Sequence, residues 1–287
     1  MKDKIIIYIQ KEILKINKKK YSKIYVEKKI LPLIYYINLS NKKKFLIGGA
    51  QGIGKTSLLI LIAKVLKKYF NKEVLTINLD NYYLSKNERR KLANNKNNLL
   101  ITRGVPGTHN IKKLKNDINS FDKNNYPISI PVFDKLVDDR LKKKKIINKK
   151  CDILLLEGWC CGCNAIDKKY LYKNINYLEE KRDADLKWRE FYNKKLNTEY
   201  KSLFNMFDIK IFLKAPSFKY VLNWRLKQER RNLSYSNKAK KMTINEIKYF
   251  IQQYEKITKW MLKNNNNSSD VVLKINKNKI IQSISIN

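Results

Sequence analysis

The stretch "FLIGGAQGIGKTSLL", residues 45–59, places several glycines between two apolar segments. The first segment is typical of a buried strand, and the second begins a helical pattern with Leu58, Ile62 and Leu66 on one face. Between them, "GAQGIGKT" at residues 49–56 matches the phosphate-loop pattern G-x-x-x-x-G-K-[ST] without a mismatch. Glycine allows the backbone to adopt positive φ and to approach phosphates closely. The alternative, a glycine-rich turn that binds nothing, is less consistent with this strand-to-helix context.

The amides at the start of the helix would contact the phosphates of a nucleotide. Lys55 would reach the β- and γ-phosphates, and the Thr56 hydroxyl would ligate Mg²⁺. The predicted nucleotide-binding segment comprises Gly49, Ala50, Gln51, Gly52, Ile53, Gly54, Lys55, Thr56 and Ser57.

Short apolar runs alternate with helical patterns over the rest of the chain: "KFLIGG", "VLTINLD", "DILLLEG", "DIKIFLK" and "DVVLKIN". Buried parallel strands joined by crossover helices have this pattern. We therefore expect an α/β fold with a parallel central sheet flanked by helices, in one domain over residues 41–287. Residues 1–40 are expected to form an amphipathic helical extension, with Ile6, Ile9, Ile13 and Ile16 at helical spacing, that ends near Pro32 and has a packing role.

The formal net charge of +38 is typical of nucleic-acid binders. However, only nine of the 63 basic residues are arginine, and the lysines are scattered along the whole length. This distribution favours a coding bias over a specific nucleic-acid surface, so a basic nucleotide-regulated nucleic-acid-binding module is kept only as an alternative.

The longest uncharged stretch, Ile30 to Asn41, is shorter than the roughly 20 apolar residues of a membrane-spanning helix, and the first residues do not resemble a signal peptide. We expect a cytoplasmic protein without a membrane partner.

Two carboxylates follow predicted strands, where parallel α/β sheets place their sites. Asp80 ends "VLTINLD" and would act as the base for an acceptor hydroxyl, or would cap the next helix. Glu157 follows four apolar residues in "DILLLEG", the position of an acidic side chain near Mg²⁺. An unpartnered carboxylate after a buried strand is rarely structural, because its burial costs several kcal/mol.

The loop "TRGVPGTHN", residues 102–110, contains an arginine and the only histidine of the chain. Arg103 offers the planar fork that matches a carboxylate, and Arg140 is the second candidate for this contact. His109 is a candidate for the acceptor site, although a lone histidine is more often a structural hydrogen-bond partner. For both arginines, an ordinary surface ion pair is the alternative.

Six ordered blocks, "GGAQGIGKTSL", "INLDNYYLS", "RGVPGTHN", "IPVFDK…DR", "EGWCCG" and "WRLKQERR…MTINE", resemble the D-glycerate 3-kinase family. This family belongs to the P-loop kinases that include phosphoribulokinase, uridine kinase and pantothenate kinase. The resemblance covers roughly residues 43–262 and implies a P-loop kinase fold with a helical lid, which uses ATP and Mg²⁺. It assigns the catalytic base to Asp80, whereas Asn81 stands where the family has a second aspartate. In "DKLVDDR" the chain is shorter than the family pattern, and Lys135 and Arg140 can be matched as substrate-binding residues.

The segment "FKYVLNWRLKQERRN" contains arginines in a lysine-rich chain. The resemblance implies that it is the lid, with Arg225 and Arg230 stabilising the transferring phosphoryl group and Arg231 contacting the nucleotide; a solvent-exposed helix face is the alternative. "TINE" at Thr243 and Glu246 is a capping box that begins a helix with Phe250, Ile251 and Tyr254 inward, and this helix is expected to be scaffold.

Together these features predict a kinase that transfers the γ-phosphoryl group of ATP to a hydroxyl of D-glycerate, giving 3-phosphoglycerate. The same reaction on a nucleoside, pantothenate or a sugar is the alternative. The sequence makes no prediction of the oligomeric state.

Overall fold

A six-stranded sheet forms the centre of the computed structural model, which describes the backbone of residues 1–233 and 243–287 and the side chains of 1–227 and 243–287. The strand order is β2-β5-β1-β6-β7-β8. The first five of these strands are parallel to one another, and only β8 runs antiparallel, at the edge beside β7. The strands are β1 (Lys44–Gly49), β2 (Val74–Asn78), β5 (Ile153–Gly158), β6 (Ile209–Lys214), β7 (Val271–Ile275) and β8 (Ile281–Ile286).

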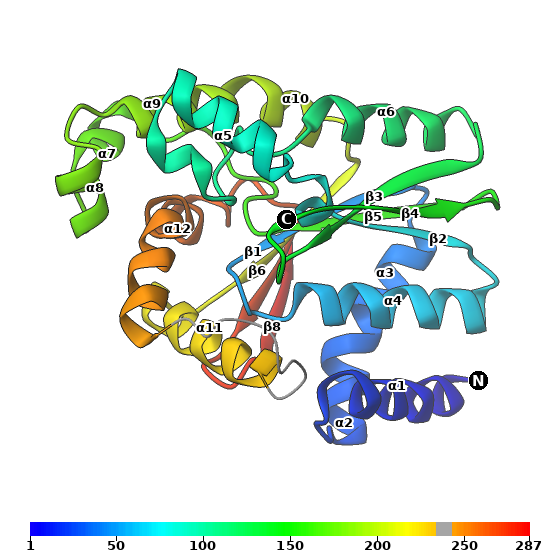
Figure 1. Cartoon of the computed structure of the whole chain (residues 1–287). Helices are drawn as coiled ribbons and strands as arrows, with labels where there is room; N and C mark the ends of the chain where they lie inside the picture. The colour runs from blue at the N-terminus through cyan, green and yellow to red at the C-terminus, as the bar shows by residue number, and fades with distance from the viewer. Residues whose placement is uncertain (234–242) are drawn as a thin grey trace.

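Helices cover both faces of the sheet (Figure 1). Strand β1 is buried on both sides: Leu46 packs in one hydrophobic cluster, and Phe45 and Ile47 pack in the other. This gives the three-layer α/β architecture that the apolar runs predict. The cluster around Leu46 includes α5 (Lys86–Asn95), α6 (Ile111–Asp122), α7 (Lys168–Tyr172), α8 (Tyr177–Arg182), α9 (Lys187–Lys195), α10 (Lys201–Phe204) and α12 (Ile244–Asn264), and the other includes α1 (Lys2–Asn17), α3 (Leu31–Leu39), α4 (Lys55–Phe70) and α11 (Phe218–Leu233).

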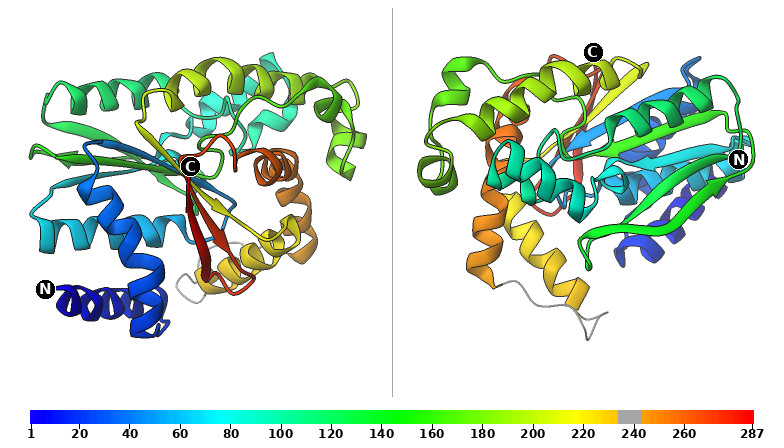
Figure 2. Two further views of the ribbon diagram at one scale, coloured as in Figure 1. Left: turned by 180° about the vertical axis from the view of Figure 1, so that it is seen from behind. Right: turned by 45° about the horizontal axis from the view of Figure 1, so that its top comes forward.

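The first forty residues are helical, as their periodicity predicts, and pack beside α4 (Figure 2). The short α2 (Lys23–Tyr25) continues through a π turn at Val26–Ile30 directly into α3. The expectation that the helices end near Pro32 is wrong, because Pro32 lies in the first turn of α3, where a backbone N–H is not needed. The apolar side chains of α1 and α3 share one hydrophobic cluster with β1 and α4. The division of the chain at residue 40 stays a prediction.

A second, two-stranded antiparallel sheet consists of β3 (Ile128–Asp134) and β4 (Asp139–Ile147). The sequence analysis does not predict it, because β4 lies largely in solvent and has no buried alternation. The turn between these strands carries Lys135 and Asp138, which take part in the contacts of the cleft described below.

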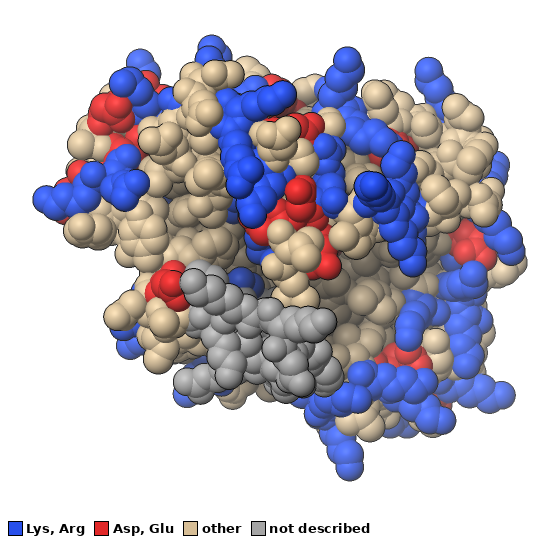
Figure 3. Space-filling view, viewed as in Figure 1, with Lys and Arg blue, Asp and Glu red and all other residues tan. Residues whose placement is uncertain are grey.

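Basic side chains are spread over the face of the molecule seen in Figure 3 rather than gathered on one element. This distribution agrees with the scatter of lysines along the sequence. Within residues 1–233 and 243–287, every helix is too short or too polar to cross a bilayer.

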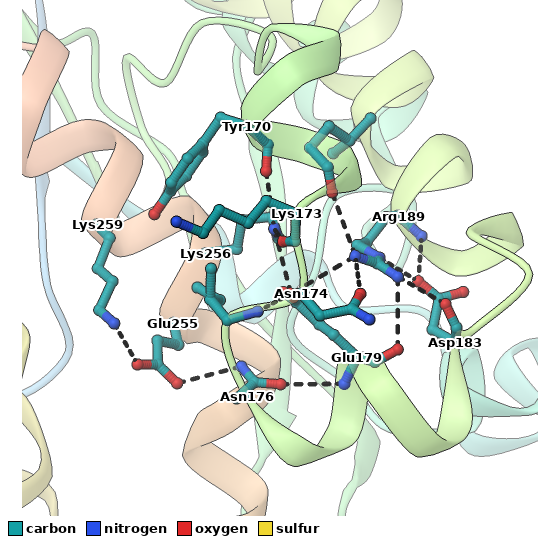
Figure 4. Close-up of polar contacts among 12 residues, drawn as sticks. Tyr170, Lys173, Asn174, Asn176, Glu179, Asp183, Arg189, Glu255, Lys256 and Lys259 are labelled. Atoms are coloured by element: carbon teal, nitrogen blue, oxygen red, sulfur yellow. Dashed lines mark hydrogen bonds and ion pairs between the residues drawn. The ribbon is translucent and has the colours of Figure 1, made fainter.

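A buried ionic network joins α12 to the segment that carries α7, α8 and α9 (Figure 4). Arg189 on α9 donates from Nε to Asp183 Oδ2 at 2.7 Å, and its guanidinium lies 3.6 Å from Glu179. Lys256 on α12 pairs with the same Glu179 at 3.1 Å and donates to the Lys173 carbonyl at 2.6 Å. All four charged side chains are at most 2% exposed. The network thus fixes the lateral position of α12, whose other face reaches the cleft.

We predict that Lys256→Ala lowers the free energy of unfolding by about 3–5 kcal/mol, because Glu179 then loses a buried partner. The matched control is Lys259→Ala on the same helix. Lys259 pairs with Glu255 and is 41% exposed, so its removal should cost about 1 kcal/mol or less. Urea denaturation of the three proteins measures both values, and equal losses in the two variants would contradict the role of the network.

Candidate active site

A cleft of about 110 Å³ lies at the carboxyl ends of β1, β2 and β5. The register of the sheet explains its composition: Glu157 on β5 stands opposite Ile47 on β1 and opposite Asn78 on β2. The phosphate loop, Asp80 and Glu157 therefore meet at one edge of the sheet, as expected for parallel strands. The cleft is lined by Gln51, Gly52, Lys55, Thr56, Asn78, Asp80, Tyr83, Arg103, Lys135, Glu157, Trp159, Arg225, Phe250, Ile251 and Tyr254.

The loop from Gly49 to Thr56 connects β1 to α4 and has the conformation that its glycines permit. Gly49 has φ 147°, and a Cβ there would lie 2.7 Å from the Leu213 carbonyl oxygen. Gly54, with φ 115°, precedes the first residue of α4. Ala50 and Ile53 are buried and hold the loop on the core, while Ser57 faces a second cavity on the other side of the loop. The sequence-based prediction of a strand, a glycine-rich loop and a helix is confirmed.

Lys55 lies inside this loop and is 7% exposed. Its Nζ donates to the carbonyl oxygens of Gly49 at 2.8 Å and Ala50 at 3.1 Å. Burial lowers the pKa of Lys55, although Glu157 and Asp80 oppose this change. A bound phosphate oxygen would replace one of these carbonyls as the hydrogen-bond acceptor of the Lys55 amine.

Thr56 and Glu157 lie in direct contact. Thr56 Oγ1 donates to Glu157 Oε1 at 2.6 Å, and Asn78 Nδ2 donates to the same oxygen at 2.7 Å. Burial raises the pKa of Glu157, while Lys55 opposes the rise. These hard oxygen atoms are the ligand type that Mg²⁺ prefers. Among the described residues no group of three or more His, Cys, Asp or Glu side chains could hold a metal ion, so a magnesium ion here would need phosphate oxygens as further ligands.

Asp80 faces into the cleft and pairs with Lys135 at 2.5 Å. Burial opposes ionisation of Asp80, but Lys135 outweighs it and lowers the pKa of Asp80 to about 2. Asp80 does not cap a helix: Asn78 caps the 3-10 turn Leu79–Tyr82, and Ser85 caps α5 through a capping box with Glu88. The alternative reading of Asp80 as a cap is therefore wrong.

Arg103 lines the cleft, and its guanidinium pairs with Asp138 on the β3–β4 turn. Its backbone carbonyl accepts a hydrogen bond from the Tyr254 hydroxyl at 3.0 Å. Arg225 also lines the cleft, with its guanidinium carbon 5.6 Å from the centre of the Phe250 ring. Phe250, Ile251 and Tyr254 of α12 thus belong to the cleft, although the sequence analysis predicts that this helix is only scaffold.

Of the predicted site arginines whose side chains are described, one does not reach the cleft. Arg140 pairs with Glu88 on α5 and is absent from the lining, which corrects its predicted contact with the acceptor. The side chains of Arg230 and Arg231 lie outside the described residues.

His109 is buried behind the cleft, and its ring stacks on Tyr83 at a centroid distance of 4.1 Å. The Tyr200 hydroxyl accepts from Gly107 N at 3.1 Å and lies 2.6 Å from His109 Nδ1. Burial lowers the pKa of His109 to about 3. His109 thus supports Tyr83, which lines the cleft, and does not itself face it.

The sequence analysis also omits Asn78, Tyr83 and Trp159. Trp159 Nε1 donates to the Gly104 carbonyl at 3.1 Å and ties the strand-end turn after β5 to the Arg103 loop. The sequence signal for these residues is their position. Each lies within two positions of a predicted site residue or inside one of the sequence blocks that resemble the family.

Comparisons with known proteins agree with this geometry. The chain is 32% identical over 219 residues to the uncharacterized kinase mug58 of Schizosaccharomyces pombe, a match that covers 72% of this chain and 76% of that protein. It is also 32% identical over 226 residues to the probable ATP-dependent kinase TDA10 of Saccharomyces cerevisiae, covering 72% of this chain and 73% of that protein. The solved D-glycerate 3-kinase of Cryptococcus neoformans superposes with a TM-score of 0.70 and 20% identity over 100% of this chain and 99% of that one. No protein-family model matches the chain.

We predict that His109, the only histidine, stays neutral from pH 7.5 to pH 5, because its pKa in the folded protein is about 3. The imidazole Hε1 resonance in proton NMR should not move over this range. The same resonance in the urea-unfolded chain is the control and should titrate near pH 6.5. A midpoint between pH 5.5 and 7 in the folded protein would show that the ring is hydrated.

Proposed function

Because this chain belongs to the D-glycerate 3-kinase-like family of P-loop kinases, we propose that it transfers the γ-phosphoryl group of ATP to a hydroxyl of D-glycerate. The observation that carries this proposal is the pairing of Asp80 with Lys135 in a small cleft that also contains Lys55 and Thr56. In the proposed reaction, Asp80 would act beside Lys55 and Thr56, the residues that would hold the terminal phosphate and its metal ion.

The size and charge of the cleft support a small anionic acceptor. Lys55, Arg103, Lys135 and Arg225 line it, against the two carboxylates of Asp80 and Glu157. Its volume of about 110 Å³ is well below the roughly 300 Å³ at which pockets for drug-sized ligands begin. A hydroxy acid of a few heavy atoms fits this space better than a nucleoside does.

Lys135 and Arg103 are the proposed contacts for the acceptor carboxylate. Lys135 stands beside Asp80, so a carboxylate bound there brings an adjacent hydroxyl to the Asp80 oxygens. The pairing of Arg103 with Asp138 fixes its guanidinium at the rim of the cleft. The position of Arg140 gives no support for its part in this clamp.

Asp80, with a pKa of about 2, would accept a hydrogen bond from the acceptor hydroxyl and orient it toward the phosphorus atom. A strong base is not needed, because phosphoryl transfer passes through a loose transition state in which the hydroxyl loses its proton late. Lys55 would hold the β- and γ-phosphates, and Arg225 would stabilise charge on the transferring group. Thr56 and Glu157 would hold Mg²⁺, which neutralises phosphate charge when bound.

Arg230 and Arg231 keep their proposed lid roles. A cytoplasmic location remains part of the proposal.

Asp80→Asn should lower kcat by about 100-fold or more and change the Kd for ADP by less than about threefold, because the carboxylate contacts the acceptor and not the nucleotide. Coupled ADP-release kinetics and calorimetric titration measure the two effects. Lys55→Ala should lose both turnover and ADP affinity. The matched control is Asp122→Asn, which removes only a surface pair with Lys44 and should behave as wild type. Full turnover in Asp80→Asn would refute the assignment.

D-glycerate should give a kcat/KM at least about 100-fold above those of a nucleoside, pantothenate and a hexose. A nucleoside and a hexose have no carboxylate for the cationic side chains, and pantothenate, which has one, is too large for a cleft of about 110 Å³. The same coupled assay with each acceptor measures this ratio, and phosphorus NMR identifies the phosphorylated hydroxyl. Turnover of a nucleoside without turnover of glycerate would overturn the acceptor, and absence of turnover with all four would overturn the kinase function.

A further inference from the structure

Two consecutive carbonyls in the loop 102–110, those of Arg103 and Gly104, accept hydrogen bonds from side chains of two distant elements. The Tyr254 hydroxyl on α12 donates to the Arg103 carbonyl at 3.0 Å, and Trp159 Nε1, just after β5, donates to the Gly104 carbonyl at 3.1 Å. Within the loop, the Gly104 amide donates to Thr108 Oγ1 at 3.1 Å. The backbone on both sides of the Arg103–Gly104 bond is therefore satisfied by protein groups and not by solvent.

Tyr254 reaches this loop because residue 104 has no side chain. A Cβ at Gly104 would lie 2.5 Å from the Tyr254 hydroxyl oxygen. The Trp159 ring packs edge-on against the Tyr254 ring, with centroids 4.9 Å apart and planes 82° apart, and both side chains are buried. Burial raises the pKa of Tyr254, so its hydroxyl remains a donor at neutral pH. The two donors thus form one packed unit against the loop.

The helix that carries Tyr254 is held in place by bonds to a different part of the chain. Lys256, two positions further along α12, pairs with the buried Glu179 in the network of Figure 4. Gln252 Oε1 accepts from Leu178 N at 2.8 Å. A side chain on an anchored helix has a better defined position than one on a loop. Tyr254 therefore sets the position of the Arg103 carbonyl relative to α12.

The guanidinium of Arg103 is held separately, by the β3–β4 hairpin. It pairs with Asp138, and its carbon lies 5.6 Å from the centre of the Phe133 ring. The Arg103 side chain is only 15% exposed and lines the cleft, as Lys135 does. A shift of the Arg103 backbone would move this guanidinium relative to Lys135, and would spoil the geometry in which both contact one carboxylate.

We propose that Tyr254 is a positioning residue for the acceptor: together with Trp159, it fixes the Arg103 backbone so that the Arg103 guanidinium meets the acceptor carboxylate. Tyr254 acts through Arg103, because its hydroxyl proton is donated to the Arg103 carbonyl. This inference rests on the proposed function, in which Arg103 binds the acceptor. Helix α12 then contributes to acceptor affinity and is more than a scaffold.

The experiment combines coupled ADP-release kinetics with D-glycerate and calorimetric titration with ADP, both on the full chain. Tyr254→Phe keeps the ring and removes the donor, so it should raise the KM for D-glycerate by about fivefold or more. The kcat and the Kd for ADP should stay within about twofold of wild type, because a carboxylate contact that is the same before and during phosphoryl transfer contributes only to binding. The matched control is Tyr249→Phe on the same helix, 36% exposed, which should behave as wild type.

A double-mutant cycle distinguishes positioning from direct contact with the acceptor. Arg103→Ala should itself raise the KM for D-glycerate by about tenfold or more, because it removes a charged hydrogen-bond donor. In that background Tyr254→Phe should raise the KM by no more than about twofold, because the side chain that it positions is gone. An equal fold-change in both backgrounds would show that Tyr254 contacts the acceptor itself, and would overturn the inference.

A second variant, Trp159→Phe, removes the other donor and should raise the KM for D-glycerate in the same way. Unchanged KM values in both Tyr254→Phe and Trp159→Phe would overturn the inference but leave the proposed function intact. A wild-type KM in Arg103→Ala would refute the Arg103 contact and the inference together. A wild-type chain that does not phosphorylate D-glycerate would refute the proposed function, and this inference with it.

Discussion

The parallel pairing of β1 with β5, and of β5 with β2, is the constraint on which the candidate site depends. It brings the phosphate loop after β1, Glu157 at the end of β5 and Asn78 at the end of β2 to one edge of the sheet. Asn78 then has two tasks: it donates to Glu157 and accepts from Asp80 N at 2.8 Å. The backbone of Asp80 is therefore positioned by strand register and by the Asn78 side chain, and Lys135 contacts its carboxylate. Shifting β2 by one residue would remove Asn78 from Glu157, because neighbouring residues of a strand point to opposite faces.

Electrostatics in the cleft follow from this geometry. Lys55, Lys135 and two arginines surround two carboxylates in a partly dehydrated space, and the carboxylates respond in opposite ways. The pKa of Asp80 falls because Lys135 contacts it, whereas the pKa of Glu157 rises because burial outweighs its partners. Two acidic groups in one cleft thus differ in protonation tendency, and the hydrogen bond from Thr56 opposes the rise of the pKa of Glu157 without cancelling it.

The five parallel strands of the central sheet were predictable, because each is an apolar run with polar residues or glycine at its ends. The β3–β4 hairpin was not, since "DRLKKKKII" has no buried face to produce alternation. At the site, Lys55 and Thr56 belong to a local motif, so their neighbours in space are also neighbours in sequence. Arg140 is different: its partner Glu88 lies on α5, and no local pattern distinguishes an arginine that faces a cleft from one that pairs elsewhere. The same holds for Tyr254, whose hydroxyl donates to the backbone carbonyl of Arg103, 151 positions earlier in the chain.

Hydrogen bonds of Lys19, Tyr25 and Lys29 tie the N-terminal segment to the β7–β8 region, and they join residues 253 to 259 positions apart. Translation delivers the two partners at opposite ends of this interval, and at about 5–20 residues per second they are separated by many seconds. During that time Lys19, Tyr25 and Lys29 are on the emerging polypeptide without the carbonyls and amide that later hold them. These contacts therefore form late in biogenesis, and a ribosome-stalled chain that ends before residue 276 would lack them even if the phosphate loop had already formed.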